Sequence, residues 1–84
     1  MKIELLYFGR PAEKLRTARE SIDAPDELAT LAELLAWLRL RGETWANELA
    51  DSRVRCAINQ EFSDFSARIH AHDEIAIFSP ISGG

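Results

Sequence analysis

The sequence predicts an α+β domain in which a mixed β-sheet wraps over one main helix. Segments at both ends of the chain alternate apolar and polar residues with the period of two that is typical of strands. Between them lies one amphipathic helical segment, whose single apolar stripe needs a sheet to cover it. The chain has 84 residues, which leave room for one thin core. We assign the domain to residues 1–78 and a C-terminal tail to 79–84.

The first strand is predicted over 2–8, where side chains alternate between two faces and place Leu6 and Phe8 on the outward one. The sequence at 9–11, Gly-Arg-Pro, interrupts this strand. A weaker strand is expected from about 15 to 22. The two strands would then form an N-terminal hairpin with a long turn.

The main helix is predicted over 31–41. Thr30 and Glu33 match a capping box, in which each side chain bonds the other residue's backbone N–H. A short second helix near 44–50 would place the Trp45 ring beneath the sheet or against the first helix. The apolar stripe of the main helix consists of Leu31, Leu34, Leu35 and Leu38.

The second half of the chain completes the sheet. A third strand is predicted over 54–58 and a short fourth strand around Phe62, and the polar segment 66–73 is expected to be irregular. The last strand is predicted over 74–78, with Phe78 facing outward.

An exposed apolar patch follows if the first and last strands are neighbours. Phe8, Phe62 and Phe78 would then gather on one face, and such a patch on a small domain usually marks a docking surface. The alternative is that the second helix or the hairpin covers these rings.

Composition argues against several classes of partner. The net charge of −4 opposes binding to nucleic acid or to anionic lipid, so neither is expected as a partner. The apolar runs are too short to span a membrane and no signal-peptide pattern opens the chain, so we expect a cytoplasmic protein. A local positive excess is interpreted as a solvated face that could steer an acidic partner. It consists of Arg10, Lys14, Arg16 and Arg19.

Few side chains suggest catalysis or metal binding. Cys56, the only cysteine, shares the inward face of its strand and is interpreted as a buried thiol rather than a nucleophile. His70, His72 and Asp73 resemble a metal cluster but have no third imidazole or thiolate nearby. We therefore assign no metal and no bound cofactor.

The segment after the last strand is the most informative one. Pro80 discourages continuation of the strand, so residues 79–84 are expected to form an extended tail. Gly83 and Gly84 lack Cβ atoms, and their backbone fits a slot too narrow for other residues. The α-carboxylate of Gly84 would then be the reactive group. The alternative is that the two glycines stand there by chance.

Together these residues resemble the ubiquitin-like sulfur carriers, most closely the small subunits of molybdopterin synthase (the MoaD family). The likeness spans nearly the whole chain, and its most specific part is the last strand running into Gly83-Gly84. The matching segments are Leu5 to Gly9 with Ala12-Glu13, Thr30 to Leu38, Ala57 to Gln60, and Asp73 to Pro80.

The resemblance implies a β-grasp fold and a chemical role for the tail. An ATP-using, ubiquitin-activating-like adenylyltransferase would adenylate Gly84, and sulfur would replace AMP to give a thiocarboxylate. The tail would then enter the large subunit of molybdopterin synthase, in a heterotetramer, and give sulfur to cyclic pyranopterin monophosphate. Catalytic side chains would belong to that partner. The residues implied to contact partners are Phe8, Phe62 and Phe78 in the domain and Pro80, Ile81 and Ser82 in the tail.

The chain departs from the family pattern at Ala12, Ser79 and His72, where the family often has Arg, Pro and Gly. Histidine tolerates positive φ better than most residues, which makes His72 acceptable in a turn. Three other functions stay open: a thiamine-pathway sulfur carrier, a ubiquitin-like modifier that forms isopeptide bonds, and a plain interaction module.

Overall fold

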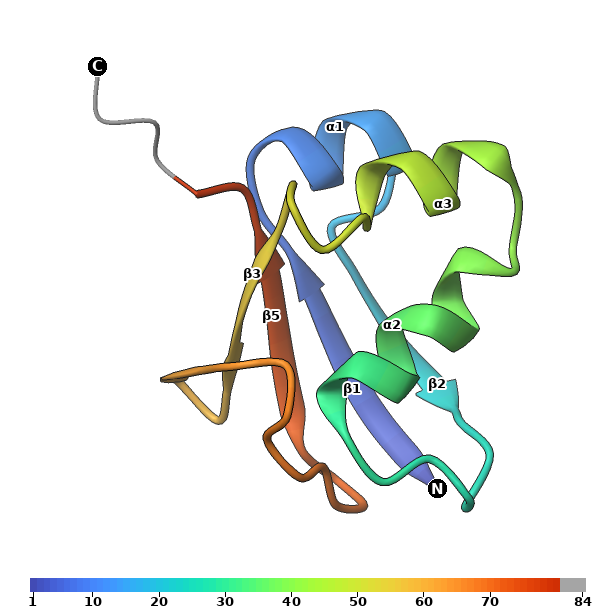
Figure 1. Ribbon diagram of the computed structural model, residues 1–84, viewed down its shortest axis with the longest axis vertical. Coiled ribbons are helices and arrows are strands. Elements are labelled where there is room, and N and C mark those ends of the chain that lie inside the picture. Colours follow the sequence, from blue (N-terminus) through green and yellow to red (C-terminus); the bar gives the residue numbers. More distant parts are fainter. Residues whose placement is uncertain (81–84) are drawn as a thin grey trace.

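The computed structural model describes residues 1–80, whose strands form one five-stranded mixed sheet in the order β2-β1-β5-β3-β4. The first and last strands lie parallel and side by side, and the other pairings are antiparallel (Figure 1). The two terminal strands are therefore neighbours, which is the condition on which the expected apolar patch depends. The strands are β1 (Lys2–Tyr7), β2 (Arg19–Asp23), β3 (Arg55–Ile58), β4 (Glu61–Ser63) and β5 (Glu74–Phe78).

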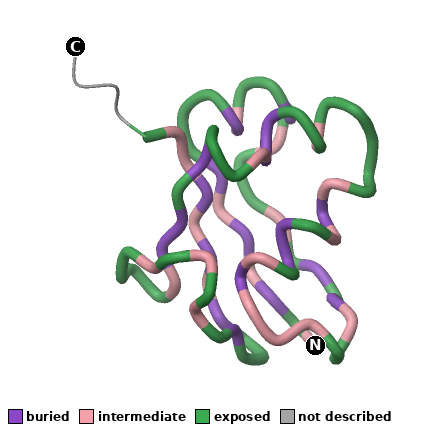
Figure 2. Tube along the Cα trace, in the orientation of Figure 1, coloured by how far each residue is buried: buried purple, intermediate pink, exposed green. Residues whose placement is uncertain are grey.

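The main helix, α2 (Leu31–Arg39), lies across one face of the sheet (Figure 1). Its capping box is present as predicted: the Glu33 N–H donates to the Thr30 hydroxyl at 3.3 Å, and Glu33 Oε1 accepts from the Thr30 N–H at 3.1 Å. The helix ends two residues earlier than predicted. All four leucines of the predicted stripe are fully buried. Figure 2 shows that the buried segments gather where the strands and helices face each other.

The segment after β1 corrects a prediction. It forms a helix, α1 (Arg10–Leu15), rather than a long hairpin turn. Pro11 lies in its first turn, where the missing N–H costs no hydrogen bond. Pro11 and Leu15 are four residues apart, and both are buried. The strand predicted from 15 to 22 therefore begins only at Arg19, because its first residues belong to the helix and its C-cap.

The second predicted helix is α3 (Glu43–Glu48), which packs against α1 and α2. The Trp45 ring meets the Tyr7 ring edge to face, with centroids 5.9 Å apart, and the Arg41 guanidinium lies 4.5 Å from the centroid of the Trp45 ring. Because Tyr7 points inward from β1, Trp45 packs beneath the sheet, which was one of the two placements predicted.

Residues with left-handed backbone form the turn between β3 and β4 and the turn that precedes β5. Asn59 and Gln60 have φ values of 51° and 72°, and His72 has 73°. The Asn59 amide donates to Asp73 Oδ1 at 3.0 Å and accepts from the Glu74 N–H at 2.9 Å, and the His70 N–H donates to Asp73 Oδ2 at 2.7 Å. Asp73 therefore holds the loop before β5 together.

Within residues 1–80, no helix is long and apolar enough to cross a membrane.

Candidate functional site: the outer face of the sheet and the base of the tail

The face of the sheet turned away from α2 has an apolar row across its middle. Leu6, Ala76, Ala57 and Phe62 are register partners across β1, β5, β3 and β4. The two alanine side chains are small, so the centre of this row projects little from the sheet. Phe62 projects from its edge and is 86% exposed. The row thus offers a shallow apolar surface bordered by an aromatic ring.

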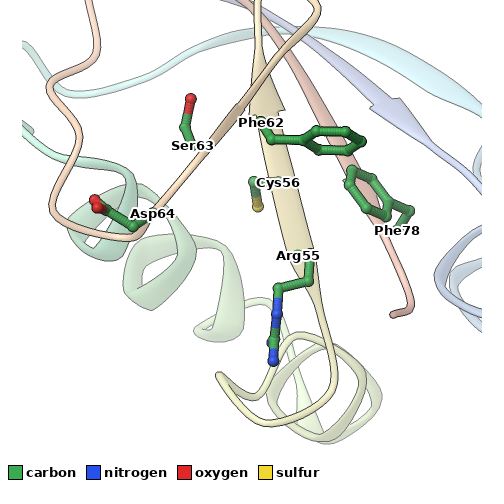
Figure 3. Close-up of a pocket in the computed structure, with 6 residues that line it drawn as sticks. All are labelled: Arg55, Cys56, Phe62, Ser63, Asp64 and Phe78. Carbon is green, nitrogen blue, oxygen red and sulfur yellow. The ribbon is translucent and has the colours of Figure 1, made fainter. Parts of the chain in front are cut away.

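A hollow opens beside Phe62 (Figure 3). The rings of Phe62 and Phe78 contact each other edge to face, with centroids 5.8 Å apart and planes at 65°. Arg55, from β3, lies at the border of the hollow, next to its register partner Phe78. The hollow is lined by Arg55, Cys56, Phe62, Ser63, Asp64 and Phe78.

Phe8 stands at the same end of the sheet. Its backbone N–H donates to the Ile77 carbonyl at 3.0 Å, which keeps the end of β1 alongside β5. Phe8 is 52% exposed. The alternative in which a helix or hairpin covers these rings is wrong for Phe8 and Phe62. We call the three side chains, Phe8, Phe62 and Phe78, the aromatic patch.

The base of the tail adjoins the aromatic patch. β5 ends at Phe78, directly followed by Ser79 and the exposed Pro80. Among residues 1–80, the Ser79 hydroxyl oxygen is the buried side-chain polar atom without a hydrogen-bond partner. The other tail residues predicted to act in the site lie outside the described residues. They are Ile81, Ser82, Gly83 and Gly84.

Cys56 is buried, as predicted, and burial raises the pKa of its thiol to about 12. A thiol with so high a pKa carries almost no thiolate near neutral pH, which argues against a nucleophile. The His70-His72-Asp73 cluster has a structural use, because Asp73 is engaged by Asn59 and by the His70 backbone. No group of three or more metal-ligating side chains occurs within residues 1–80.

A buried carboxylate joins two arginines close to the base of the tail. Glu48, at the end of α3, is 7% exposed, and its Oε1 accepts from Arg10 Nε at 2.9 Å. Its Oε2 lies 3.7 Å from Arg53 Nη1. The hydrogen bond and charge of Arg10 hold the pKa of Glu48 below its ordinary value.

Sequence reasoning missed Arg55 and Glu48. Alternation along β3 places Arg55 outward beside Ala57 and Phe78, so the period-two pattern contained this signal. Glu48 had no such signal, because its partner Arg10 was assigned to a turn rather than to a helix that packs against α3. The predicted positive face is confirmed only in part: Arg10 is ion-paired, whereas Lys14, Arg16 and Arg19 are exposed.

The mixed sheet, the helix across its inner face and the outward aromatic patch define a ubiquitin-like β-grasp domain. A model of the ThiS family matches residues 5–84, and the chain belongs to this family.

Similar proteins agree with this assignment. The chain is 29% identical over 82 residues to the molybdopterin synthase sulfur carrier subunit of Haemophilus influenzae, covering 98% of this chain and 99% of that protein. The subunit of the same name in Escherichia coli strain K12 is 28% identical with the same coverage. A solved complex of subunits 1 and 2 of molybdopterin-converting factor from Helicobacter pylori contains a chain that is 25% identical, with full coverage of both chains and a TM-score of 0.67.

The fold is shared more widely. The solution structure of the HVO 2177 protein from Haloferax volcanii matches with a TM-score of 0.81, at 22% identity over 100% of this chain and 87% of that one. At this identity the likeness shows the fold alone.

Proposed function

We propose that this chain is the sulfur-carrier subunit of a molybdopterin synthase, with Gly84 as the residue that carries sulfur. The observation that supports this most is the family match, which runs through Gly83 and Gly84 and is joined by relatives of that name over nearly their whole length. The exposed aromatic patch beside the base of the tail fits a domain that docks on a larger protein and offers it the tail.

The chemistry requires activation, because a free carboxylate is a poor electrophile. An adenylyltransferase binds ATP, the Gly84 carboxylate attacks the α-phosphorus of that ATP, and pyrophosphate leaves. Sulfide then attacks the carbonyl carbon of the acyl adenylate and AMP leaves, which produces a thiocarboxylate. In the large subunit, the thiocarboxylate sulfur displaces an oxygen substituent from a carbon of cyclic pyranopterin monophosphate and forms a thioester. Water then attacks the thioester carbonyl, and cleavage of its carbon–sulfur bond leaves the sulfur on the substrate and restores the Gly84 carboxylate.

The domain contributes docking and presentation to this reaction. Its described residues include no reactive thiolate, since burial keeps Cys56 protonated. The aromatic patch would bind the large subunit and the adenylyltransferase in turn, while Pro80, Ile81 and Ser82 lead the glycines into the partner's site. Catalytic side chains then belong to the partners.

Intact-mass spectrometry of protein isolated from its own cells tests the central step. We expect a fraction of the chain to carry one sulfur in place of one oxygen, and tandem fragmentation to locate that change at Gly84. A variant with one alanine added after Gly84 is the matched control, because it keeps the domain intact and lacks the mass change. Absence of the sulfur form from the unaltered chain, under conditions where a known carrier shows it, contradicts the proposal.

A genetic test separates the two sulfur pathways. The chain should restore molybdoenzyme activity in a strain that lacks the small subunit of molybdopterin synthase, and the alanine-extended variant should not. Rescue of thiamine auxotrophy alone would assign the chain to the thiamine pathway. Isopeptide adducts of the chain on cellular proteins, without rescue of either strain, would identify a modifier.

A further inference from the structure

We infer that Arg10, Arg53 and Arg55 form a cationic rim around the base of the tail that pairs with carboxylates of the large subunit, next to the surface that receives the aromatic patch. This inference rests on the proposed function and specifies the chemistry of the partner surface. We call these three residues the arginine rim.

The rim residues come from separate segments that the fold brings together where β5 ends. Arg55 is the register partner of Phe78 and lines the hollow beside it. Arg10 opens α1, two residues after Phe8, whose N–H is bonded to the Ile77 carbonyl. Arg53 and Arg10 lie close together because both contact the Glu48 carboxylate.

The three guanidinium groups are accessible, and those of Arg10 and Arg55 are also held by hydrogen bonds. Arg55 Nη1 donates to the Val54 carbonyl at 2.8 Å and to the Asp51 carbonyl at 3.4 Å, and within residues 1–80 this guanidinium has no carboxylate at salt-bridge distance. The side chains of Arg10 and Arg53 are 53% and 50% exposed. Side chains fixed in this way lose little rotamer freedom on pairing with a partner.

The nearby carboxylates leave the rim with excess positive charge. Glu48 offsets one arginine, and Lys14 accompanies Glu13 on α1. Asp64, which lines the same hollow as Arg55 and accepts hydrogen bonds from Ser66, offsets a second arginine, so one positive charge of the three stays in excess. The chain as a whole carries a net charge of −4, so this cationic end stands out against an acidic molecule.

A protein partner with carboxylates fits this rim better than a nucleic acid does. The rim is small and continuous with the aromatic patch, which forms an apolar centre with a polar border as in protein interfaces. The acidic remainder of the chain repels the phosphate backbone of a nucleic acid. Charges at the border of an interface act mainly on the association rate and on its salt dependence.

The test measures association with the large subunit of molybdopterin synthase from the same organism, by stopped-flow fluorescence at low and at high salt. For the unaltered chain we expect the association rate to fall as salt rises. Arg53→Gln/Arg55→Gln should lower the low-salt rate about tenfold and flatten the salt dependence, with the dissociation rate nearly unchanged. Glu48→Gln should act in the opposite direction, because it removes the charge that offsets Arg10 and Arg53.

Lys2→Gln/Arg68→Gln is the matched control. It removes the same charge from the opposite end of the domain, where β1 begins and where Arg68 pairs with Thr30 at the start of α2. Its association rate should stay within about twofold of the unaltered chain. Circular dichroism and urea unfolding establish that each variant is folded at the concentrations used.

The outcomes separate the two proposals. Binding of the unaltered chain that is insensitive to salt, or equal loss in the rim variant and the control, overturns the rim while leaving the sulfur-carrier function intact. Absence of any complex with the large subunit at either salt concentration overturns the proposed function and the rim with it. Salt-sensitive binding of the rim to duplex DNA but not to the large subunit would identify a nucleic-acid surface instead.

Discussion

Phe62 and Phe78 contact each other edge to face across β3, the strand that separates β4 from β5, with ring centroids 5.8 Å apart. The side chain opposite Phe62 on β3 is Ala57, whose small size leaves room for the ring above it. The pair therefore holds a largely exposed phenylalanine in a defined orientation.

Phe62→Ala should weaken binding to the large subunit much more than it weakens the fold. Because Phe62 is 86% exposed, its loss should cost less than about 1 kcal/mol of unfolding free energy. An aromatic residue that anchors an interface commonly contributes about 2 kcal/mol or more to binding. Calorimetric titration and urea unfolding measure the two effects. Leu40→Ala is the control, since Leu40 is 81% exposed at the end of α2, away from the patch; equal loss of affinity in both variants contradicts the prediction.

Glu33 should make the stability of α2 depend on pH. Its carboxylate accepts from the N–H groups of Ala29 and Thr30, and these bonds hold its pKa below the ordinary value of 4.5. A group whose pKa is lowered by folding stabilises the fold above its unfolded pKa and loses this effect as pH falls through its folded pKa.

The comparison is with Glu33→Gln, which keeps an acceptor for the capping box but does not titrate. We expect the unaltered chain to be the more stable of the two near neutral pH and the difference to disappear as the medium is acidified below 4.5. Thermal unfolding across this range measures it. A difference independent of pH would show that the charge of Glu33 has no such role.

Cys56 should react with thiol reagents only when the chain unfolds. Its side chain is buried and its pKa is raised to about 12, so little thiolate exists at pH 8 and little of it is accessible. We expect labelling by an iodoacetamide reagent to be slow in buffer and fast in concentrated urea, with mass spectrometry as the readout. Fast labelling of the native chain would contradict the buried placement.

Arg16→Gly should stabilise the domain. Arg16 caps α1 in the left-handed conformation, with φ of 53°, while its N–H donates to the Ala12 carbonyl. A residue with a Cβ pays about 1 kcal/mol there, whereas glycine adopts this conformation freely. The added freedom of glycine in the unfolded chain reduces the gain to a few tenths of a kcal/mol. Urea unfolding measures the change, and Arg16→Ala, which keeps the Cβ, should show none of it.

The sequence was sufficient to predict the helices and strands in which apolar residues recur at a clear period. β1, β5 and α2 each repeat apolar residues over several turns or pleats, and their buried faces are those predicted. Even so, α2 ends at Arg39 because the chain turns at Leu40, whose N–H bonds the Trp37 carbonyl, and the period alone does not mark this point.

The segment after β1 shows where local reasoning failed. Gly-Pro patterns favour turns, but Pro11 also suits the first turn of a helix, and the spacing of Pro11 and Leu15 was the helical signal. The segment is so short that its apolar residues repeat over only one helical turn, and such a short pattern does not distinguish a strand from a helix.

The site was predictable where it depends on the alternation of inward and outward side chains along a strand. Phe8 and Phe78 lie outward because their neighbours Tyr7 and Ile77 lie inward. The meeting of Phe62 with Phe78, and of Arg10 with Glu48, depends on which strands and helices become neighbours, and a single sequence carries no measure of that.

The parallel pairing of β1 with β5 has a consequence for synthesis. β5, the last of the five strands of this sheet in chain order, lies between β1 and β3, so a nascent chain cannot complete its hydrophobic interior until Phe78 has left the ribosome. Partly translated chains therefore lack the surface on which Phe62 and Phe78 meet. A protein that recognises this surface would bind only chains in which β5 has already been made.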